Sequence, residues 1–372
     1  MKKSLIALAA LAATSAFAQS SVSIDGQFDS GLQVISYRGT RVQGFGGNGS
    51  TTSQINFRAT QDFGGGLQAQ FRVETDWSTV SNNANTGVKK ADGTVAGTST
   101  FGNGEIRGGL IGGFGRVDFG AINNAQLDAY LTGQNFGTAI GSAFRGVFVT
   151  DALNPVAGSV VRFDNSARYL TPNLAGFSAS FLTVAKQTKA SSSNFAGLGL
   201  YDYAGVREFS LRYNQGPLNV IFASTRQDAT GVSVTTATAT ADSTVATATT
   251  QTLGANYAFG DFKVFFLNQT AKNSLVAGGK SLDRSVTTVS GQYTMGANRF
   301  NVQLGKANNK INNLSDNVFS LGYDYDLSKT TSIYARYESI NDKASIVPAN
   351  PTVAEAAGTA RKRSALGLRI GF

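Results

Sequence analysis

Apolar side chains recur at every second position through most of this chain. The pattern is clearest at the C-terminus, where Leu366, Leu368, Ile370 and Phe372 alternate with small or charged residues. Because neighbouring side chains of a β-strand point to opposite faces, this stretch predicts a strand with one apolar face. The apolar face continues to the last residue, where chain ends usually fray. A strand that is apolar on one side and carries Arg369 on the other is typical of a barrel wall between lipid and water.

The same alternation recurs in runs along the whole chain. The first run begins with Val22 and Ile24, which alternate with Ser23 and Asp25. Later runs lie at 54–60, 67–74, 209–213, 253–259, 300–304, 319–325 and 333–337. With its flanking residues, each predicted strand is about ten residues long, which is the length of a tilted strand that crosses a bilayer.

Short and long connections alternate between these runs. Short turns rich in Gly, Asn and Pro are predicted at 64–66, 112–115, 171–173, 215–217, 260–261, 296–298 and 328–330. Longer polar stretches lie at 39–52, 78–100, 123–159, 188–204, 229–249, 273–283, 308–316 and 342–359. Short turns on one side and long loops on the other are typical of an outer-membrane barrel. The seven turns and eight loops imply about sixteen strands, with a margin of two because 101–122 and 284–295 alternate poorly.

Residues 1–18 have the features of a cleaved signal peptide, so the barrel is expected to comprise residues 19–372. A basic start at Lys2 is followed by the short apolar run Leu5–Ala13 and by an Ala-x-Ala cleavage pattern at Ala16–Ala18. The apolar run is too short to span a bilayer as a helix. No later stretch resembles a transmembrane helix, so any membrane span must be a β-strand.

The composition narrows the possible functions. The chain has 372 residues and contains no Cys and no His. A disulfide, a zinc site, a thiolate nucleophile and an imidazole base are therefore impossible, which argues against most hydrolases and metalloenzymes. We expect neither a metal nor a cofactor. The isoelectric point is near 9.6, but no aromatic stacking platform accompanies the basic residues, so nucleic-acid binding is not expected.

A secreted β-sandwich or β-helix would also show alternating apolar and polar residues. Three features favour the membrane barrel. The strands are uniform in length, the connections alternate between short and long, and the inward-facing sets are strongly polar. The last feature gives a mean hydropathy of −0.08 to a chain that would otherwise need a large apolar core.

Several strings resemble the general porins of Gram-negative β-proteobacteria. They are Asp62–Ala69, Gly113–Gly120, Asn165–Phe177 and the terminal Phe372, which matches the assembly signal of that family. The resemblance covers the layout of the whole mature chain. It implies a sixteen-stranded, water-filled antiparallel β-barrel, usually a homotrimer, whose third extracellular loop folds into the lumen and narrows it.

The segment 123–159 stands where this third loop is expected. It contains several glycines and three phenylalanines, Phe136, Phe144 and Phe148, which suit a backbone that bends tightly and packs against the inner wall. An ordinary surface loop is the alternative. The segment lacks the Pro-Glu-Phe-Gly type of string that is usual in the family. Its only acidic residues are Asp128 and Asp151, so the sequence leaves open how negative the loop side of the lumen is.

Five arginines fall on inward positions of the strands that face the third loop in this family. They are Arg58, Arg72, Arg107, Arg162 and Arg168. Arg162 also lies three residues before Asn165, as a wall arginine does in an anion-selective relative. Guanidinium groups stay charged at any working pH, so such a ladder would attract anions and repel cations. Glu74, Glu105 and Asp128 are expected to offset part of this field.

Other inward charges are expected on wall positions away from the loop. They are Glu208, Arg212, Asp324, Asp326, Arg361, Arg363 and Arg369. The run Arg361–Arg363 is interpreted as a solvated rim in contact with lipopolysaccharide phosphates.

The sequence therefore predicts a passive diffusion channel of the outer membrane for small hydrophilic solutes and ions, with a preference for anions. The chain is expected to form a homotrimer in contact with outer-membrane lipids and lipopolysaccharide. A substrate-specific channel is one alternative, although the inward sets lack a line of aromatic residues. An adhesin or a structural barrel is another, but no residues remain for a passenger domain. A barrel enzyme is disfavoured because there is no His.

Overall fold

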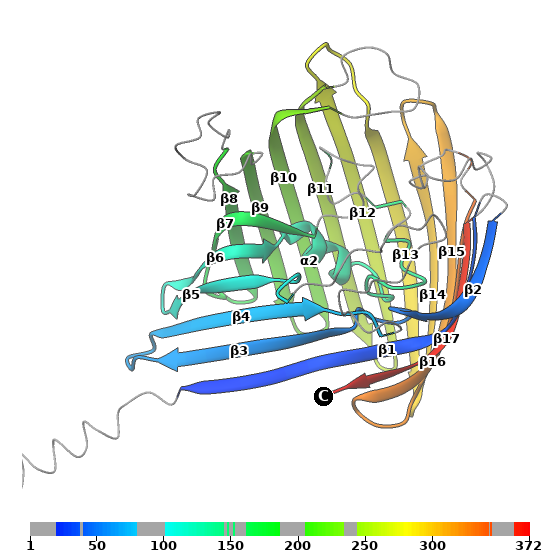
Figure 1. The fold of residues 1–372 in the computed structure, drawn as a ribbon, viewed down its shortest axis with the longest axis horizontal. Helices are drawn as coiled ribbons and strands as arrows, with labels where there is room; N and C mark the ends of the chain where they lie inside the picture. The colour runs from blue at the N-terminus through cyan, green and yellow to red at the C-terminus, as the bar shows by residue number, and fades with distance from the viewer. Residues whose placement is uncertain are drawn as a thin grey trace, which may run out of the picture.

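The computed structural model forms one antiparallel sheet that closes into a barrel (Figure 1). It describes residues 20–37, 40–79, 101–144, 147–148, 152, 161–186, 205–233, 244–341, 343 and 361–372. The elements in the first half of the chain are β1 (Ser21–Tyr37), β2 (Thr40–Gly47), β3 (Gln54–Asp62), β4 (Gln68–Asp76), β5 (Ile106–Gly112), β6 (Gly115–Asn123), α2 (Ala125–Thr132), β7 (Arg162–Leu170) and β8 (Phe177–Val184). Those in the second half are β9 (Gly205–Gln215), β10 (Leu218–Ser233), β11 (Thr244–Phe259), β12 (Phe262–Leu275), β13 (Asp283–Met295), β14 (Asn298–Asn309), β15 (Leu314–Asp326), β16 (Thr331–Ile340) and β17 (Arg361–Gly371).

The barrel has sixteen strands, as predicted, although seventeen segments belong to the sheet. Both β2 and β3 pair with β1, through Ser30–Gly47 and Gln27–Gln54, so they are two halves of one barrel strand. The C-terminal strand β17 pairs with β1 and closes the barrel. At the seam, the amide of Phe372 donates to the carbonyl of Gly26 over 3.1 Å, so the last residue is held in the wall.

All seven predicted short turns are confirmed. They connect successive strands at 63–67, 113–114, 171–176, 216–217, 260–261, 296–297 and 327–330. Two-residue hairpins need positive φ, which L side chains rarely adopt. Gly216 and Gly260 meet this need with φ angles of 61° and 55°. The turns gather at one end of the barrel, which the porin-like layout assigns to the periplasm.

Three of the predicted long loops are shorter than expected. The stretch 39–52 contains β2, and the stretch 308–316 reduces to the four residues between β14 and β15. In 229–249, β10 continues to Ser233 and β11 begins at Thr244. Thr and Val favour extended backbone, and pairing satisfies their backbone groups, so strands continue past the membrane edge. The loops at 78–100, 188–204 and 342–359 lie almost wholly outside the described residues, as does the predicted signal peptide.

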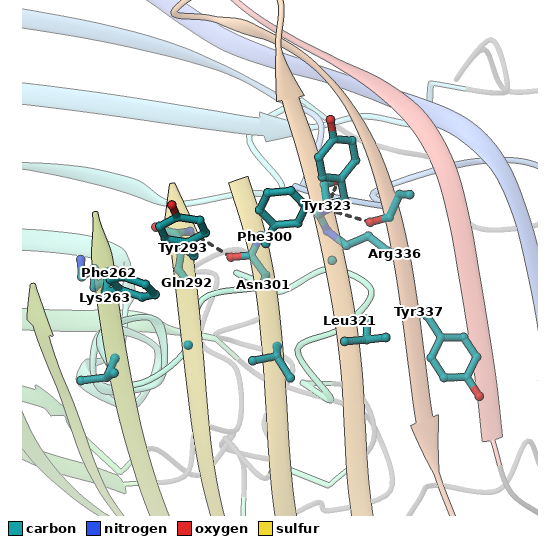
Figure 2. A pocket seen from close by; sticks show the side chains of 15 residues that line it. Phe262, Lys263, Gln292, Tyr293, Phe300, Asn301, Leu321, Tyr323, Arg336 and Tyr337 are labelled. Atoms are coloured by element: carbon teal, nitrogen blue, oxygen red, sulfur yellow. Dashed lines mark hydrogen bonds between the residues drawn. The ribbon is translucent and has the colours of Figure 1, made fainter. Parts of the chain in front are cut away.

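The outer face carries the apolar belt that the alternation predicts. Near the short turns, aromatic rings form a row across neighbouring strands, with centroid separations of 4.5 Å for Phe262–Tyr293 and 5.2 Å for Phe300–Tyr323 (Figure 2). Such aromatic girdles mark the level of the membrane interface in outer-membrane barrels. Beside the row, the small residue Gly291 helps to leave an apolar groove of about 570 Å³.

Candidate pore constriction

The third loop starts with α2 directly after β6. Asn124 caps this helix, because its side-chain oxygen accepts a hydrogen bond of 2.9 Å from the amide of Leu127. The helix ends at Gly133, whose amide bonds back to the carbonyls of Ala129 and Tyr130. It lies inside the barrel, over β10 and β11 (Figure 1). Among the described residues, no helix has the length and apolar character needed to cross a membrane.

Hydrogen bonds from the wall hold this helix in place. The Glu208 carboxylate on β9 accepts from the amide of Ala125 over 2.6 Å, next to the positive end of the helix dipole. The side-chain amide of Gln126 donates to the Thr225 hydroxyl at 2.8 Å and to the Thr250 carbonyl at 3.1 Å. These side chains are all buried, so the inner faces of β9, β10 and β11 are covered by the loop rather than by water.

An apolar cluster fixes the middle of the loop. The ring of Tyr130 packs 4.6 Å from Phe144 and 4.8 Å from Phe148. The wall side of this cluster consists of inward-facing apolar residues on five consecutive strands: Leu267, Val286, Ala307, Val318 and Ile340. The Tyr130 hydroxyl donates to the carbonyl of Ser142 over 2.7 Å, and burial raises the pKa of Tyr130 well above its usual range. The predicted folding of the third loop into the lumen is thereby confirmed.

The second half of the loop is held by Glu338 on β16. One carboxylate oxygen accepts from the amides of Gly141 and Ala143 at 3.1 and 2.8 Å. The same carboxylate binds Arg361 at 3.0 Å and Arg363 at 2.8 Å. The interpretation of these two arginines as a solvated rim was therefore wrong. They point inward because they alternate with Lys362 along β17, and they neutralise the carboxylate that anchors the loop.

The expectation that the remaining inward charges lie away from the loop was also wrong in part. Glu208 binds a loop amide directly, and Arg212 lies 3.9 Å from Asp128 on α2. Glu338 was not among the predicted residues, although it also binds loop amides. The sequence pattern gave the inward direction of these residues but not the path of the loop across the strands. We call the inner face of β9 to β16, which carries the loop, the loop wall.

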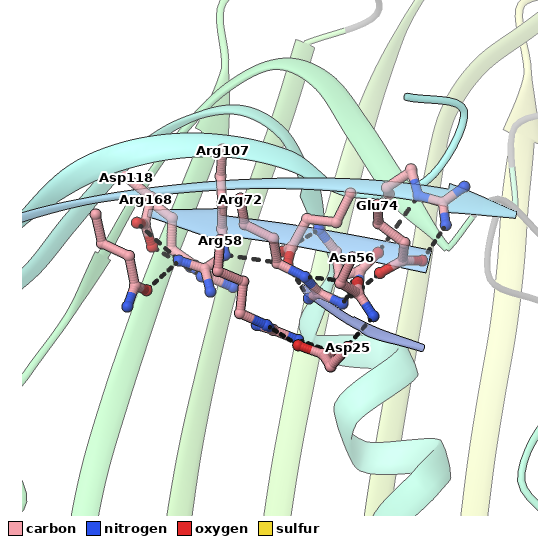
Figure 3. A network of polar contacts seen from close by, with 12 residues as sticks. Asp25, Asn56, Arg58, Arg72, Glu74, Arg107, Asp118 and Arg168 are labelled. Atoms are coloured by element: carbon pink, nitrogen blue, oxygen red, sulfur yellow. Dashed lines mark hydrogen bonds and ion pairs between the residues drawn. The ribbon is translucent and has the colours of Figure 1, made fainter. Parts of the chain in front are cut away.

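The five predicted arginines lie on the opposite side, on the inner face of β3 to β7, and we call this face, with Asp25 of β1 at its edge, the arginine wall. Figure 3 shows Arg58, Arg72, Arg107 and Arg168 in this wall. Arg58 pairs with Asp25 at 2.7 Å. Arg72 binds Glu105 at 2.6 Å and also contacts Glu74. Two of the three acids that were expected to offset the arginines, Glu74 and Glu105, therefore lie among them on the same wall.

Asp118 on β6 joins the remaining arginines of this wall. Its carboxylate has no exposed surface and lies 2.7 Å from Arg116, 2.8 Å from Arg168 and 3.4 Å from Arg107. Asp118 and Arg116 were missed as site residues, although both lie in the porin-like string at 113–120 and share an inward parity. Both residues occupy inward-facing positions on β6, between the strands that carry Arg107 and Arg168. This position was the sequence signal that could have identified them.

Arginines and carboxylates nearly balance on the arginine wall. The network contains six arginines, Arg58, Arg72, Arg107, Arg116, Arg162 and Arg168, and five carboxylates, Asp25, Glu74, Asp76, Glu105 and Asp118. One positive charge is therefore in excess. Among the described residues of the third loop, Asp128 is the only acid, and its half-exposed side chain faces Arg212.

The two walls meet around a cavity of about 540 Å³, which we call the constriction cavity. Arg72, Glu74, Asp76 and Arg162 line it on the arginine wall, and Arg363 of β17 lines it as well. The loop side is formed mainly by apolar or small residues, Leu127, Leu131, Gly137, Thr138, Ala139, Ile140 and Phe144. The other three predicted arginines belong to the same ion-pair network without lining this cavity. Among the residues the structure describes, no group of three potential ligands could hold a metal ion.

A closed barrel with an apolar outer belt and a charged, narrowed interior defines a water-filled channel through a membrane. The chain belongs to the Gram-negative porin family, whose profile, described as Gram-negative porin, matches residues 4–345. It is accordingly a non-enzymatic diffusion channel of the bacterial outer membrane. The family resemblance inferred from the strings at 62–69, 113–120 and 165–177 is confirmed.

Similar proteins support this assignment. Outer membrane porin protein 32 of Delftia acidovorans is 29% identical over 378 residues, which cover 100% of this chain and 99% of that protein. The solved anion-selective porin from Comamonas acidovorans has a TM-score of 0.73 at 24% identity, covering 95% of this chain and all of that one. The trimer form of OmpT from Vibrio cholerae has a TM-score of 0.64 at 15% identity, covering 95% and 99%. The last two comparisons show the shared fold.

Proposed function

We propose that this porin lets small hydrophilic solutes pass with a preference for anions, and that the arginine wall sets this preference. The observation that carries the proposal is the excess of one positive charge on the arginine wall, opposite a loop face that is apolar where it borders the cavity. A cation in the cavity would meet two carboxylates, Glu74 and Asp76, which already pair with Arg162, whereas three arginines line the cavity when Arg363 is included. An anion can approach Arg162, whose side chain is 22% exposed and borders the cavity.

The size of the preference follows from this near-balance of charges. One unit charge acts on an ion about 4 Å away with roughly 1 kcal/mol in bulk water, which raises the local concentration of an anion about fivefold and lowers that of a cation about fivefold. A fully uncompensated ladder would give a far larger effect. The ion pairs therefore favour a moderate preference. They also keep the arginine side chains extended along the wall, so that the lumen stays open.

The assembly of this chain as a homotrimer belongs to the proposal as well. A related barrel, OmpT of Vibrio cholerae, has been solved in a trimer form. The cleavage of a signal peptide after residue 18, the role of Phe372 in assembly and contact of the outer surface with lipopolysaccharide complete the proposal. Chemical cross-linking of the protein extracted in mild detergent would distinguish trimer from monomer.

Reversal potentials under a KCl gradient test the preference for anions. Arg58→Glu and Arg162→Glu in one chain change the charge of the arginine wall by four units while both side chains keep their inward positions. We expect the variant to prefer cations. The matched control is Lys280→Glu with Asp283→Lys, which exchanges an exposed ion pair at the rim and should leave the potential unchanged. A double arginine variant with the reversal potential of the wild type would exclude the arginine wall as the source of selectivity.

A further inference from the structure

The second barrel strand is interrupted by an insertion that enters the lumen. Between the pairs Ser30–Gly47 and Gln27–Gln54, the two residues Phe28 and Asp29 of β1 face the six residues 48–53. This part of the second strand therefore contains four more residues than β1 has opposite it. We call residues 48–53 the strand insertion. Bulges in barrels bend a strand and redirect its side chains, and they commonly lie next to functional sites.

Asp29 gives this insertion a fixed shape. Its carboxylate has no exposed surface and accepts from three successive backbone amides, those of Gly49 at 3.1 Å, Ser50 at 2.7 Å and Thr51 at 2.8 Å. The hydroxyl of Tyr334 on β16 donates to the same carboxylate over 2.6 Å. Three amides and a hydroxyl that would otherwise be buried without partners are thus satisfied by one side chain.

The insertion reaches the tip of the third loop. The carbonyl of Gly49 accepts from the amide of Ile140 at 3.3 Å, and the hydroxyls of Thr52 and Thr138 lie 3.3 Å apart. A side chain at Gly49 would collide with Tyr334, since a Cβ there would lie 2.4 Å from the Tyr334 hydroxyl. Because Gly49 has no side chain, the insertion can pack closely against Tyr334 and reach the loop tip.

Both partners border the constriction cavity. Asn48, Thr51 and Thr52 of the insertion line it beside Thr138 and Ile140 of the loop tip. The insertion carries no charged side chain. It therefore contributes to the width of the pore and to the position of the loop, but not to the field of the arginine wall.

We propose that the strand insertion is a second constriction element, which holds the tip of the third loop and fixes the width of the pore, and that Asp29 is its positioning residue. The insertion then adds an attachment at the loop tip to those at Glu208, at the apolar cluster around Tyr130 and at Glu338. This proposal rests on the channel function and not on the preference for anions. Conductance tests the first, and the reversal potential tests the second.

A disulfide between the insertion and the loop tip tests the contact. The chain has no Cys, so Thr52→Cys with Thr138→Cys gives a single defined pair. We expect the pair to oxidise readily in folded protein, and the oxidised and reduced channels to have the single-channel conductance of the wild type. Each single Cys variant is the control. Failure to oxidise, or a conductance that differs between oxidised and reduced channels, would show that the loop tip does not rest on the insertion and would overturn the proposal.

Shortening the insertion tests its effect on pore width. Replacement of residues 48–53 by two glycines would make β2 and β3 one continuous strand opposite Phe28 and Asp29. Because the narrowest level of a pore limits its conductance, we expect a rise of roughly 1.5-fold or more, with an unchanged reversal potential. Circular dichroism and heat-modifiable electrophoretic mobility would verify the folded barrel. A folded variant with wild-type conductance would refute a constricting role.

Asp29→Asn tests the positioning residue with little change in volume. If the new NH2 group faces Ser50 and Thr51, two hydrogen bonds are lost; if it faces Gly49, that bond is lost and the Tyr334 hydroxyl must turn to accept. We expect larger open-channel current noise and brief changes in conductance as the loop tip is released. The control is Asp326→Asn, at the end of β15, whose carboxylate binds Arg299 at 3.1 Å and belongs neither to the insertion nor to the arginine wall. Equal noise in both variants would contradict a specific role for Asp29.

Discussion

The two inner walls of this barrel come from the same alternating pattern but present different chemistry to the lumen. On the arginine wall, strands of seven to nine residues carry charged side chains that pair with one another and face water. On the loop wall, all the strands are longer, and their inner faces combine neutral side chains such as Leu267 with the charged anchors Glu208 and Glu338, which the third loop covers. The arginine wall presents charged groups to ions in the lumen, and the loop wall supports the third loop.

This difference shows that inward parity alone does not make a residue part of the pore. Leu267 and Val286 point inward, yet neither is accessible to a solute, because Tyr130 and Phe144 lie over them. Apolar residues at inward positions are the sequence signal of such a covered face. They also explain the poor alternation of 284–295, since Val286 packs under the loop while Val289 faces lipid on the opposite side.

The largest effect is expected when the loop is released from its wall. Tyr130→Ala removes a fully buried ring from the centre of the apolar cluster, and losses of this kind cost about 3–5 kcal/mol. The loop should detach from the loop wall, and single-channel conductance should increase. The backbone hydrogen bonds between the barrel strands should stay intact. Tyr257→Ala, on the outer face of β11, is the control. Equal conductance of the two variants would mean that the loop does not narrow the pore.

A smaller effect is expected from the arginine wall. Asp118→Asn leaves Arg107, Arg116 and Arg168 without their shared carboxylate. Breaking a buried pair costs about 3–5 kcal/mol, and contact with lumen water should reduce this cost. Urea unfolding in vesicles can be followed through Trp77, the single Trp of the chain.

The control for this loss of stability is the exposed pair of Asp25 and Arg58, whose side chains are 44% and 34% accessible. Asp25→Asn should cost less than about 1 kcal/mol. If the two variants unfold at the same urea concentration, Asp118 is not the centre of the network.

The smallest effect is expected when one charge is removed without loss of packing. Glu74→Gln leaves the arginine wall with two excess positive charges in place of one, next to the constriction cavity. The local concentration of anions should rise by up to about fivefold, and the reversal potential should shift further towards that of chloride. Glu208→Gln is the comparison on the loop wall, where α2 covers the carboxylate, and it should give a smaller shift. A larger shift from Glu208→Gln would reverse the roles assigned to the two walls.

Most of the fold could be predicted from the sequence, because period-two alternation and turn residues are local signals. The seven turns and the sixteen strands follow from them. The division of the second strand into β2 and β3 could not be predicted, since it depends on Asp29 and Tyr334, which are far apart in the chain. The inward direction of the five arginines could be predicted from parity, and their common wall from the resemblance to the porin family. Their pairing with Glu74, Glu105 and Asp118 could not, because it depends on register between strands.

The positions of Glu208 and Glu338 show a similar limit. Each looks like an ordinary inward charge in its strand, and only the path of the loop turns it into an anchor. The buried position of Arg361 and Arg363 follows from the same path, since these side chains balance Glu338.

Ion selectivity of the wild-type protein is the most direct test of the account. Single channels in a planar bilayer under a KCl gradient would give both conductance and reversal potential. We predict open channels with a reversal potential shifted moderately towards that of chloride. A potential shifted towards that of potassium would contradict the role of the arginine wall, even though the barrel and its covered loop wall would stand.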